Sequence, residues 1–119
     1  MCRIGIYNNG TNISPSSLLL DAGEVDAGSL GVKTIIVDQA LTKGLYWLAL
    51  ASNEVYGLRQ LNSLFAPIGI DPTNLRAPYV AWYSTFTYGA LPDPFPSPST
   101  FSTSNALRQL IFARLKSLD

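Results

Sequence analysis

Residues 44–51, Gly44-Leu45-Tyr46-Trp47-Leu48-Ala49-Leu50-Ala51, decide the fold expected for this chain of 119 residues. The run is apolar at both alternating side-chain positions, and the polar residues Thr42 and Lys43 lead into it. Successive side chains of a strand point to opposite faces, so a run that is apolar throughout predicts a strand buried on both faces. The same pattern predicts that Trp47 lies in the core.

Three segments upstream of this run also have strand character. Residues 2–7 alternate between two side-chain faces, as in a half-buried strand, whereas residues 17–22 and 32–37 are rich in Leu, Ile and Val. The Asn, Gly and Pro residues of 8–15 predict a turn between the first two strands, and the glycines of 23–28 predict a bend followed by a short edge segment.

The second half of the chain is less regular. Residues 55–61 fit a strand slightly better than a helix, and the prolines and glycine of 66–74 predict a long loop. The β-favouring residues of 79–88 predict a strand, and alternate prolines make 91–105 an extended Pro/Ser/Thr segment. Residues 106–118 have apolar spacing that favours a helix, while the order of elements favours a closing strand.

Composition predicts one domain spanning residues 1–119, with part of its apolar surface covered by a partner. Charged residues make up 13% and hydrophobic residues 47%, against about 25% charged residues in typical soluble domains. The formal net charge is zero and the basic residues are dispersed, which argues against a nucleic-acid partner. No apolar run reaches the roughly 20 residues that span a bilayer, so we expect no membrane insertion.

The residues needed for common catalytic sites are missing from the sequence. The chain has no histidine, which removes Ser-His-Asp and Cys-His catalysis, and no Gly-rich loop with a P-loop lysine. We therefore expect no enzymatic activity and no cofactor. Cys2 is expected to be a small buried residue. The acidic residues Asp21, Glu24 and Asp26 form a weak candidate Ca²⁺ site, but a solvated turn explains them better because their spacing does not match a calcium loop.

An aromatic cluster with a neighbouring cation is the best candidate for recognition. Exposed Tyr and Trp rings offer rigid surfaces on which sugar rings stack. The more ordinary role of such rings is to fill the core or a subunit interface. The candidate ligand-binding residues are Arg76, Tyr79, Trp82, Tyr83 and Tyr88.

Several segments, in their order along the chain, resemble one family of modules. They are Arg3–Asn8, Ser17–Gly23, Gly31–Ile35, Leu41–Ala49, Tyr79–Tyr83, Tyr88–Pro92 and Phe112–Leu115. This pattern is similar to the jelly-roll β-sandwich modules of tailed-phage virion proteins, namely tail fibres, tailspikes and capsid appendages, and to related bacterial carbohydrate-binding modules. The first half of the chain carries most of the resemblance.

The resemblance implies an all-β fold, a jelly-roll-like antiparallel β-sandwich with long Pro-rich loops. It further implies a homotrimer assembled in the host cytoplasm and located in the virion, in contact with other virion proteins. A sandwich normally has strands before the one that begins at Cys2. We therefore expect a fragment of a longer chain, an internally initiated product, or a protomer whose sandwich is completed by partner strands.

Three hypotheses for function follow. The first is a non-enzymatic tail-fibre or tailspike receptor-binding module that recognises a host-surface polysaccharide. The second is a capsid-decoration or tail-assembly module without a glycan ligand. The third is a cellular carbohydrate-binding module attached to a hydrolase.

Overall fold

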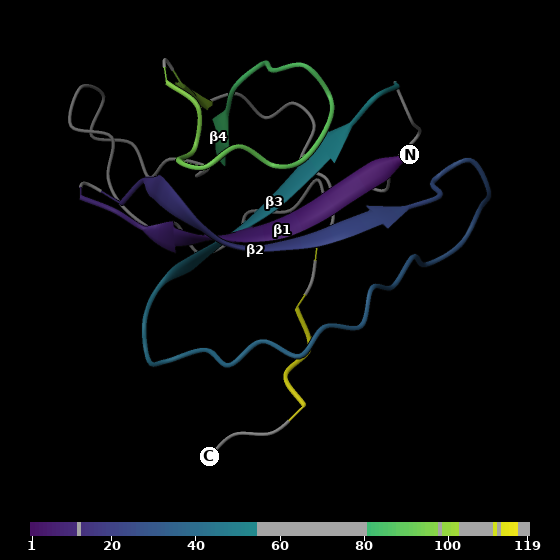
Figure 1. The fold of residues 1–119 in the computed structure, drawn as a ribbon, viewed down its shortest axis with the longest axis horizontal. Helices are drawn as coiled ribbons and strands as arrows, with labels where there is room; N and C mark the ends of the chain where they lie inside the picture. The colour runs from purple at the N-terminus through teal and green to yellow at the C-terminus, as the bar shows by residue number, and fades with distance from the viewer. Residues whose placement is uncertain (12, 55–80, 98, 103–110, 112, 117–119) are drawn as a thin grey trace.

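The computed structural model describes residues 1–11, 13–54, 81–97, 99–102, 111 and 113–116, and it is rich in strands (Figure 1). An antiparallel sheet has the order β2-β1-β3, and β4 and β5 form a second antiparallel pair. The described residues contain no helix, so the described part of the chain is strand-rich and antiparallel, as the sequence predicted. The strands are β1 (Cys2–Asn9), β2 (Pro15–Val25), β3 (Tyr46–Ser52), β4 (Ala81–Tyr83) and β5 (Thr100–Ser102).

The N-terminal strand lies at the centre of the sheet. Tyr7 of β1 is opposite Leu18 of β2 on one side and Trp47 of β3 on the other. The turn predicted between β1 and β2 is confirmed: the Gly10 amide donates to the Ser14 carbonyl oxygen at 2.7 Å. The central position of β1 explains why a segment so near the N-terminus contains two of the three buried apolar side chains in the described part of the chain.

The bend predicted at 23–28 takes a different form in the structure. β2 continues through Gly23 as far as Val25, and the bend is a bulge within the strand. Ile4 is opposite Gly23 but Gly5 is opposite Asp21, so Ala22 is an extra residue. A bulge needs an unusual backbone conformation, which Gly23 provides at φ +89°.

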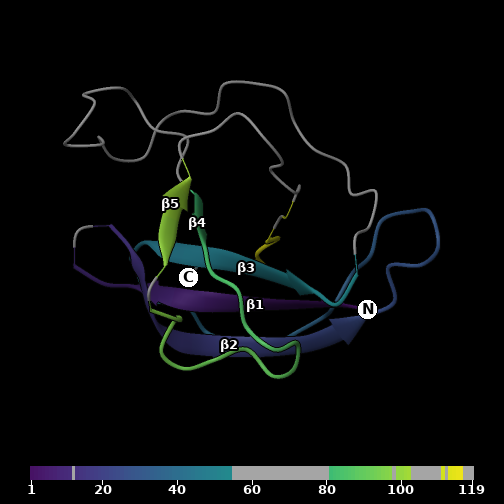
Figure 2. The ribbon, with the colours of Figure 1, turned by 90° about the horizontal axis from the view of Figure 1, so that it is seen from above.

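The core of the described residues lies above one face of the sheet, under residues 88–97, a segment that we call the strap (Figure 2). Tyr7 and Leu91 are only 1% and 7% exposed. Gly5 permits this approach, because a Cβ there would collide with Leu91 Cδ1 and would lie 2.6 Å from the Leu20 carbonyl oxygen. Cys2, at 2% exposed, is the small buried residue that the sequence predicted.

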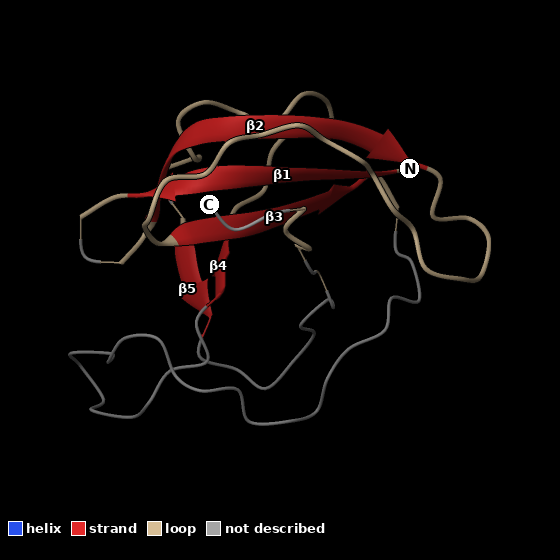
Figure 3. Ribbon diagram, turned by 90° about the horizontal axis from the view of Figure 1, so that it is seen from below, coloured by secondary structure: helices blue, strands red, loops and turns tan. Residues whose placement is uncertain are grey.

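A long irregular segment, residues 26–45, crosses the opposite face of the sheet (Figure 3). We call this segment the arm. The strand predicted at 32–37 is wrong, because these residues adopt no regular structure. Val32 and Ile36 are 95% and 93% exposed, and Leu30 is fully exposed. High β-propensity was the basis of the prediction, but a strand also needs a hydrogen-bonded neighbour, and among the described residues the arm has none.

The strand that decided the expected fold is present but is less buried than predicted. It begins at Tyr46, so Gly44 and Leu45 precede it. Leu48 is exposed and Trp47 is only partly buried, so the prediction of burial on both faces is wrong. Leu48 and Leu50 are opposite Ile6 and Ile4 of β1, on the face that points away from Gly5 and the strap. The arm crosses this face and covers it incompletely, since Leu48 is exposed.

The second half of the chain is only partly described. Within 79–88 the strand covers only Ala81–Tyr83 in the described residues, and within 91–105 the residues Thr100–Ser102 form β5. Residues 111 and 113–116 have no regular structure, and the rest of 106–118 lies outside the described residues, as do 55–61 and 66–74. The described part of the chain contains no helix of the length and hydrophobicity needed to cross a bilayer.

Candidate functional site

The strap is held on the sheet by hydrogen bonds and by one contact between aromatic rings. Tyr7 donates its hydroxyl proton to the Pro92 carbonyl oxygen at 2.7 Å, and the Tyr7 and Phe95 rings meet edge to face with centroids 5.3 Å apart. The Leu91 amide donates to Asp21 Oδ2 at 2.9 Å. These contacts join residues that are at least 70 positions apart, so they hold a tertiary connection and not a local turn.

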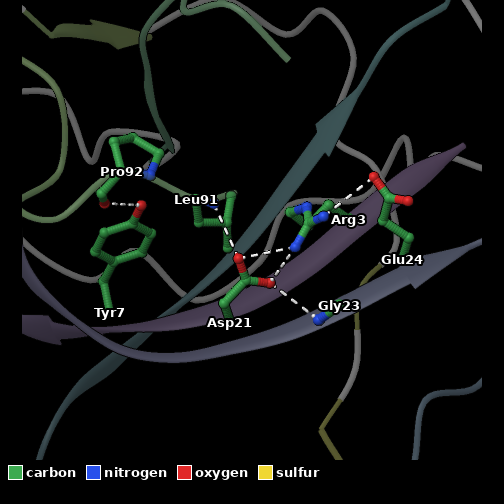
Figure 4. A network of polar contacts seen from close by, with 7 residues as sticks. All are labelled: Arg3, Tyr7, Asp21, Gly23, Glu24, Leu91 and Pro92. Carbon is green, nitrogen blue, oxygen red and sulfur yellow. Dashed lines mark hydrogen bonds and ion pairs between the residues drawn. The ribbon is translucent and has the colours of Figure 1, made fainter. Parts of the chain in front are cut away.

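A cluster of charged side chains lies beside the strap (Figure 4). Arg3 Nη1 donates to both carboxylate oxygens of Asp21 at 3.0 Å, and Arg3 Nη2 lies 3.1 Å from Glu24 Oε1. The Gly23 amide also donates to Asp21 Oδ1 at 3.0 Å. Asp21 therefore links three parts of the molecule: β1 through Arg3, the bulge of β2 through Gly23, and the strap through Leu91.

The protonation of these groups follows from their contacts. Burial acts to raise the pKa of Asp21, but the hydrogen bonds from the Leu91 and Gly23 amides and from Arg3 outweigh it and lower the pKa. The pKa of Arg3 is raised, chiefly by its hydrogen bond to Asp21. Burial, with a smaller contribution from the charges of Asp21 and Asp93, raises the pKa of Tyr7 to about 12. At neutral pH the cluster is a paired set of fixed charges.

Two buried polar atoms near the charged cluster lack a hydrogen-bond partner within the described part of the chain. They are Arg3 Nε and the Tyr88 hydroxyl oxygen. Burial raises the pKa of Tyr88, and the neighbouring Glu24 adds to the rise. The sequence predicted that Tyr88 binds a ligand. In the structure Tyr88 is half-buried beside the charged cluster.

The structure separates the other candidate ligand-binding residues. Trp82 Nε1 donates to the Ile13 carbonyl oxygen at 3.2 Å, and Trp82 is partly buried. Tyr83 follows it in β4, so its side chain points to the other face, and it is 55% exposed. Arg76 and Tyr79 lie outside the described residues. The described aromatic residues do not form one flat platform.

The three residues of the weak candidate metal site all have partners within the protein. Asp21 and Glu24 bind Arg3, and Asp26 Oδ1 accepts a hydrogen bond from the Gly28 amide at 2.8 Å. The last contact is the kind of turn that the sequence favoured over a cation site. No group of three metal-ligating side chains occurs among the residues that the structure describes.

The arm carries a candidate surface that the sequence patterns did not identify. Lys33 and Ile35 are partly buried, whereas Val32, Thr34 and Ile36 are exposed. The outward side of the arm is therefore largely apolar. In the sequence, this segment shows only the residue pattern of a strand. The sequence does not show that, among the described residues, the arm lacks a hydrogen-bonded neighbouring strand.

Comparisons of the chain with models of protein families, with curated proteins and with solved structures found no match.

Proposed function

We propose that the chain is a non-enzymatic structural subunit of a homo-oligomeric assembly, and that the arm is its main contact surface. The observation that carries the proposal is the exposure of Leu30, Val32 and Ile36 along one continuous segment. Single exposed apolar residues are ordinary on protein surfaces, but several on one segment are typical of an interaction site.

The backbone of the arm supports the same proposal. An extended segment with β-branched residues and no hydrogen-bonded neighbour among the described residues has unused main-chain groups as well as apolar side chains. A neighbouring protein chain satisfies both needs together by pairing as a strand. The low charge content of the chain also reduces repulsion between copies.

The resemblance to phage appendage modules suggests the kind of assembly. We place the chain in a virion, as a capsid-decoration or tail-assembly module that contacts other virion proteins. In this proposal the sheet β2-β1-β3 is one layer of a jelly-roll-like sandwich, and partner strands complete the second layer. Three copies would form the homotrimer that the resemblance implies.

The arm proposal is tested by the size of the protein in solution. Ile36→Asp places a charge on the outward side of the arm and should shift the protein from oligomer to monomer in light scattering and sedimentation. Thr85→Asp is the matched control, because Thr85 is exposed outside the arm and receives the same charge. A wild-type protein that is folded by circular dichroism and monomeric at every concentration would refute the proposal.

Recognition of a host-surface polysaccharide is the second candidate function. It is favoured by the exposure of Tyr83 and Phe86, whose rings are accessible for stacking on sugars. Tyr83→Ala should remove binding on an array of host polysaccharides, while Tyr83→Phe, which keeps the ring, should retain most of it. If neither the wild type nor Tyr83→Phe binds any glycan on the array, the assembly function stands without this one.

A further inference from the structure

The outer edge of β2 is the feature that leads beyond the proposed function. β2 ends the sheet order β2-β1-β3 on one side, and an exposed edge strand offers unpaired amide and carbonyl groups to any other strand. Two such groups are already in use here. The Leu18 amide donates to Asp93 Oδ1 at 2.9 Å, and the Ser16 carbonyl oxygen accepts from the Phe95 amide at 2.8 Å.

The strap thus occupies the position of a neighbouring strand at the edge of β2. Asp93 supplies a carboxylate oxygen where a strand would supply a carbonyl oxygen, and Phe95 supplies an ordinary amide donor. Figure 2 shows the strap passing beside β2. Both groups are held in place from the sheet, since Tyr7 contacts the Pro92 carbonyl oxygen and the Phe95 ring.

The composition of the strap also limits what it offers to others. Pro92, Pro94 and Pro96 have no amide proton, so at these positions the strap cannot donate to a further strand. A segment that pairs with an edge and has few donors of its own closes that edge without creating a new one. Proline and charged residues are known means of protecting edge strands.

We propose that the strap is an edge guard, which occupies the pairing groups of Ser16 and Leu18 and so prevents the β2 strand of a second copy from adding to the sheet. The excluded partner is another copy because an antiparallel pair of identical strands is self-complementary. β2 also contains the apolar run Leu18–Leu20, which favours such pairing. This inference concerns β2 and not the arm, so it is independent of the proposed function.

The guard is tested by a matched pair of variants at Asp93. Asp93→Ala removes the acceptor for the Leu18 amide, whereas Asp93→Asn keeps an acceptor oxygen in its place. In Asp93→Ala, hydrogen exchange of the Leu18 amide should become about tenfold faster, in line with the loss of one hydrogen bond. In Asp93→Asn it should stay near the wild-type rate.

Strand addition is measured with a labelled peptide that copies residues 15–25. Folded Asp93→Ala should capture this peptide and should form larger species on incubation, while the wild type and Asp93→Asn should do neither. A folded Asp93→Ala that matches Asp93→Asn in both exchange and peptide capture would overturn the proposal. Peptide capture by the untreated wild type would overturn it as well.

A second measurement covers the case in which Asp93→Ala does not fold. The wild type is titrated with urea below its unfolding midpoint, and exchange of the Leu18 amide is followed together with peptide capture. The guard predicts that capture begins at the urea concentration at which the Leu18 amide loses its protection. Capture that begins well before this loss would overturn the proposal.

Discussion

The two faces of the sheet β2-β1-β3 are covered in different ways. The strap covers one face with prolines, one edge-to-face aromatic contact and several hydrogen bonds, and it buries Tyr7 and Leu91. The arm crosses the other face with more β-favouring residues, yet it leaves Val32 and Ile36 almost fully exposed. In this chain, the segment with poor intrinsic strand propensity makes the stable connection, and the segment with good propensity does not.

The difference shows what makes a covering segment stable. The strap reaches fixed partners, namely the Asp21 carboxylate, the Tyr7 hydroxyl group and the edge of β2. Each partner orders part of the strap at little extra cost, because the partners are already held by the sheet. Within the described residues, the side-chain hydrogen bonds between the arm and the sheet are local ones between Tyr46 and Thr42, four positions apart, and the outward apolar side chains of the arm remain available to another chain.

The largest expected effect comes from removing the side chain that joins the strap to the sheet. Tyr7→Ala should lower the free energy of unfolding by about 3–5 kcal/mol, as is typical for truncating a buried aromatic residue. Leu30→Ala, on the arm, is the control and at low protein concentration should change it by less than about 0.5 kcal/mol because Leu30 is fully exposed. Urea denaturation measures both, and equal losses would contradict the contrast between the two faces.

The next effect concerns Asp21 and acid. Asp21→Ala removes the acceptor of the Leu91 amide and of Arg3 Nη1 and should cost about 1–3 kcal/mol at neutral pH. Because folding lowers the pKa of Asp21, its contribution is present above the ordinary value of 3.8 and is lost as the pH falls below it. Stability measured against pH should therefore fall in acid for the wild type.

Asp21→Asn separates the charge from the hydrogen bonds. It keeps an acceptor oxygen for the Leu91 amide, so it should cost less than Asp21→Ala at neutral pH, and it has no carboxyl group to titrate. The part of the acid-induced loss that comes from Asp21 should be absent in this variant. An unchanged dependence on pH would show that other groups cause it.

The sequence was sufficient for the elements that rest on local patterns. The alternation of residues 2–7 and the turn residues of 8–15 predicted β1 and the loop to β2, because strand faces and turns depend on neighbouring residues. The prediction of a strand at 32–37 failed. A strand needs a hydrogen-bonded neighbouring strand, and the sequence does not show whether one lies beside this segment. The prediction for the bend at Gly23 also failed, because a bulge and a turn use the same residue types.

Less of the candidate surfaces could be predicted. The aromatic cluster was found from composition, but the sequence did not indicate that Trp82 would bond to the Ile13 carbonyl oxygen or that Tyr88 would lie beside the charged cluster. The sequence suggested for Asp21 only a place in a solvated turn or, less well, in a cation site. Its role depends on Arg3, 18 positions away, and on Leu91, 70 positions away, and such pairs follow from topology and not from local spacing.

The smallest effect on folding is expected at Val32, and it distinguishes an assembly surface from a poorly packed part of the fold. Val32→Ala should change the stability of the isolated chain by less than about 0.5 kcal/mol, because the side chain is 95% exposed. If the arm binds a second copy, however, folding and association are linked, and stability rises with protein concentration. Urea denaturation at low and at high protein concentration should therefore give a loss for Val32→Ala only at high concentration. A loss of equal size at both concentrations would mean that Val32 packs within its own chain, and the contrast between arm and strap would then be one of degree.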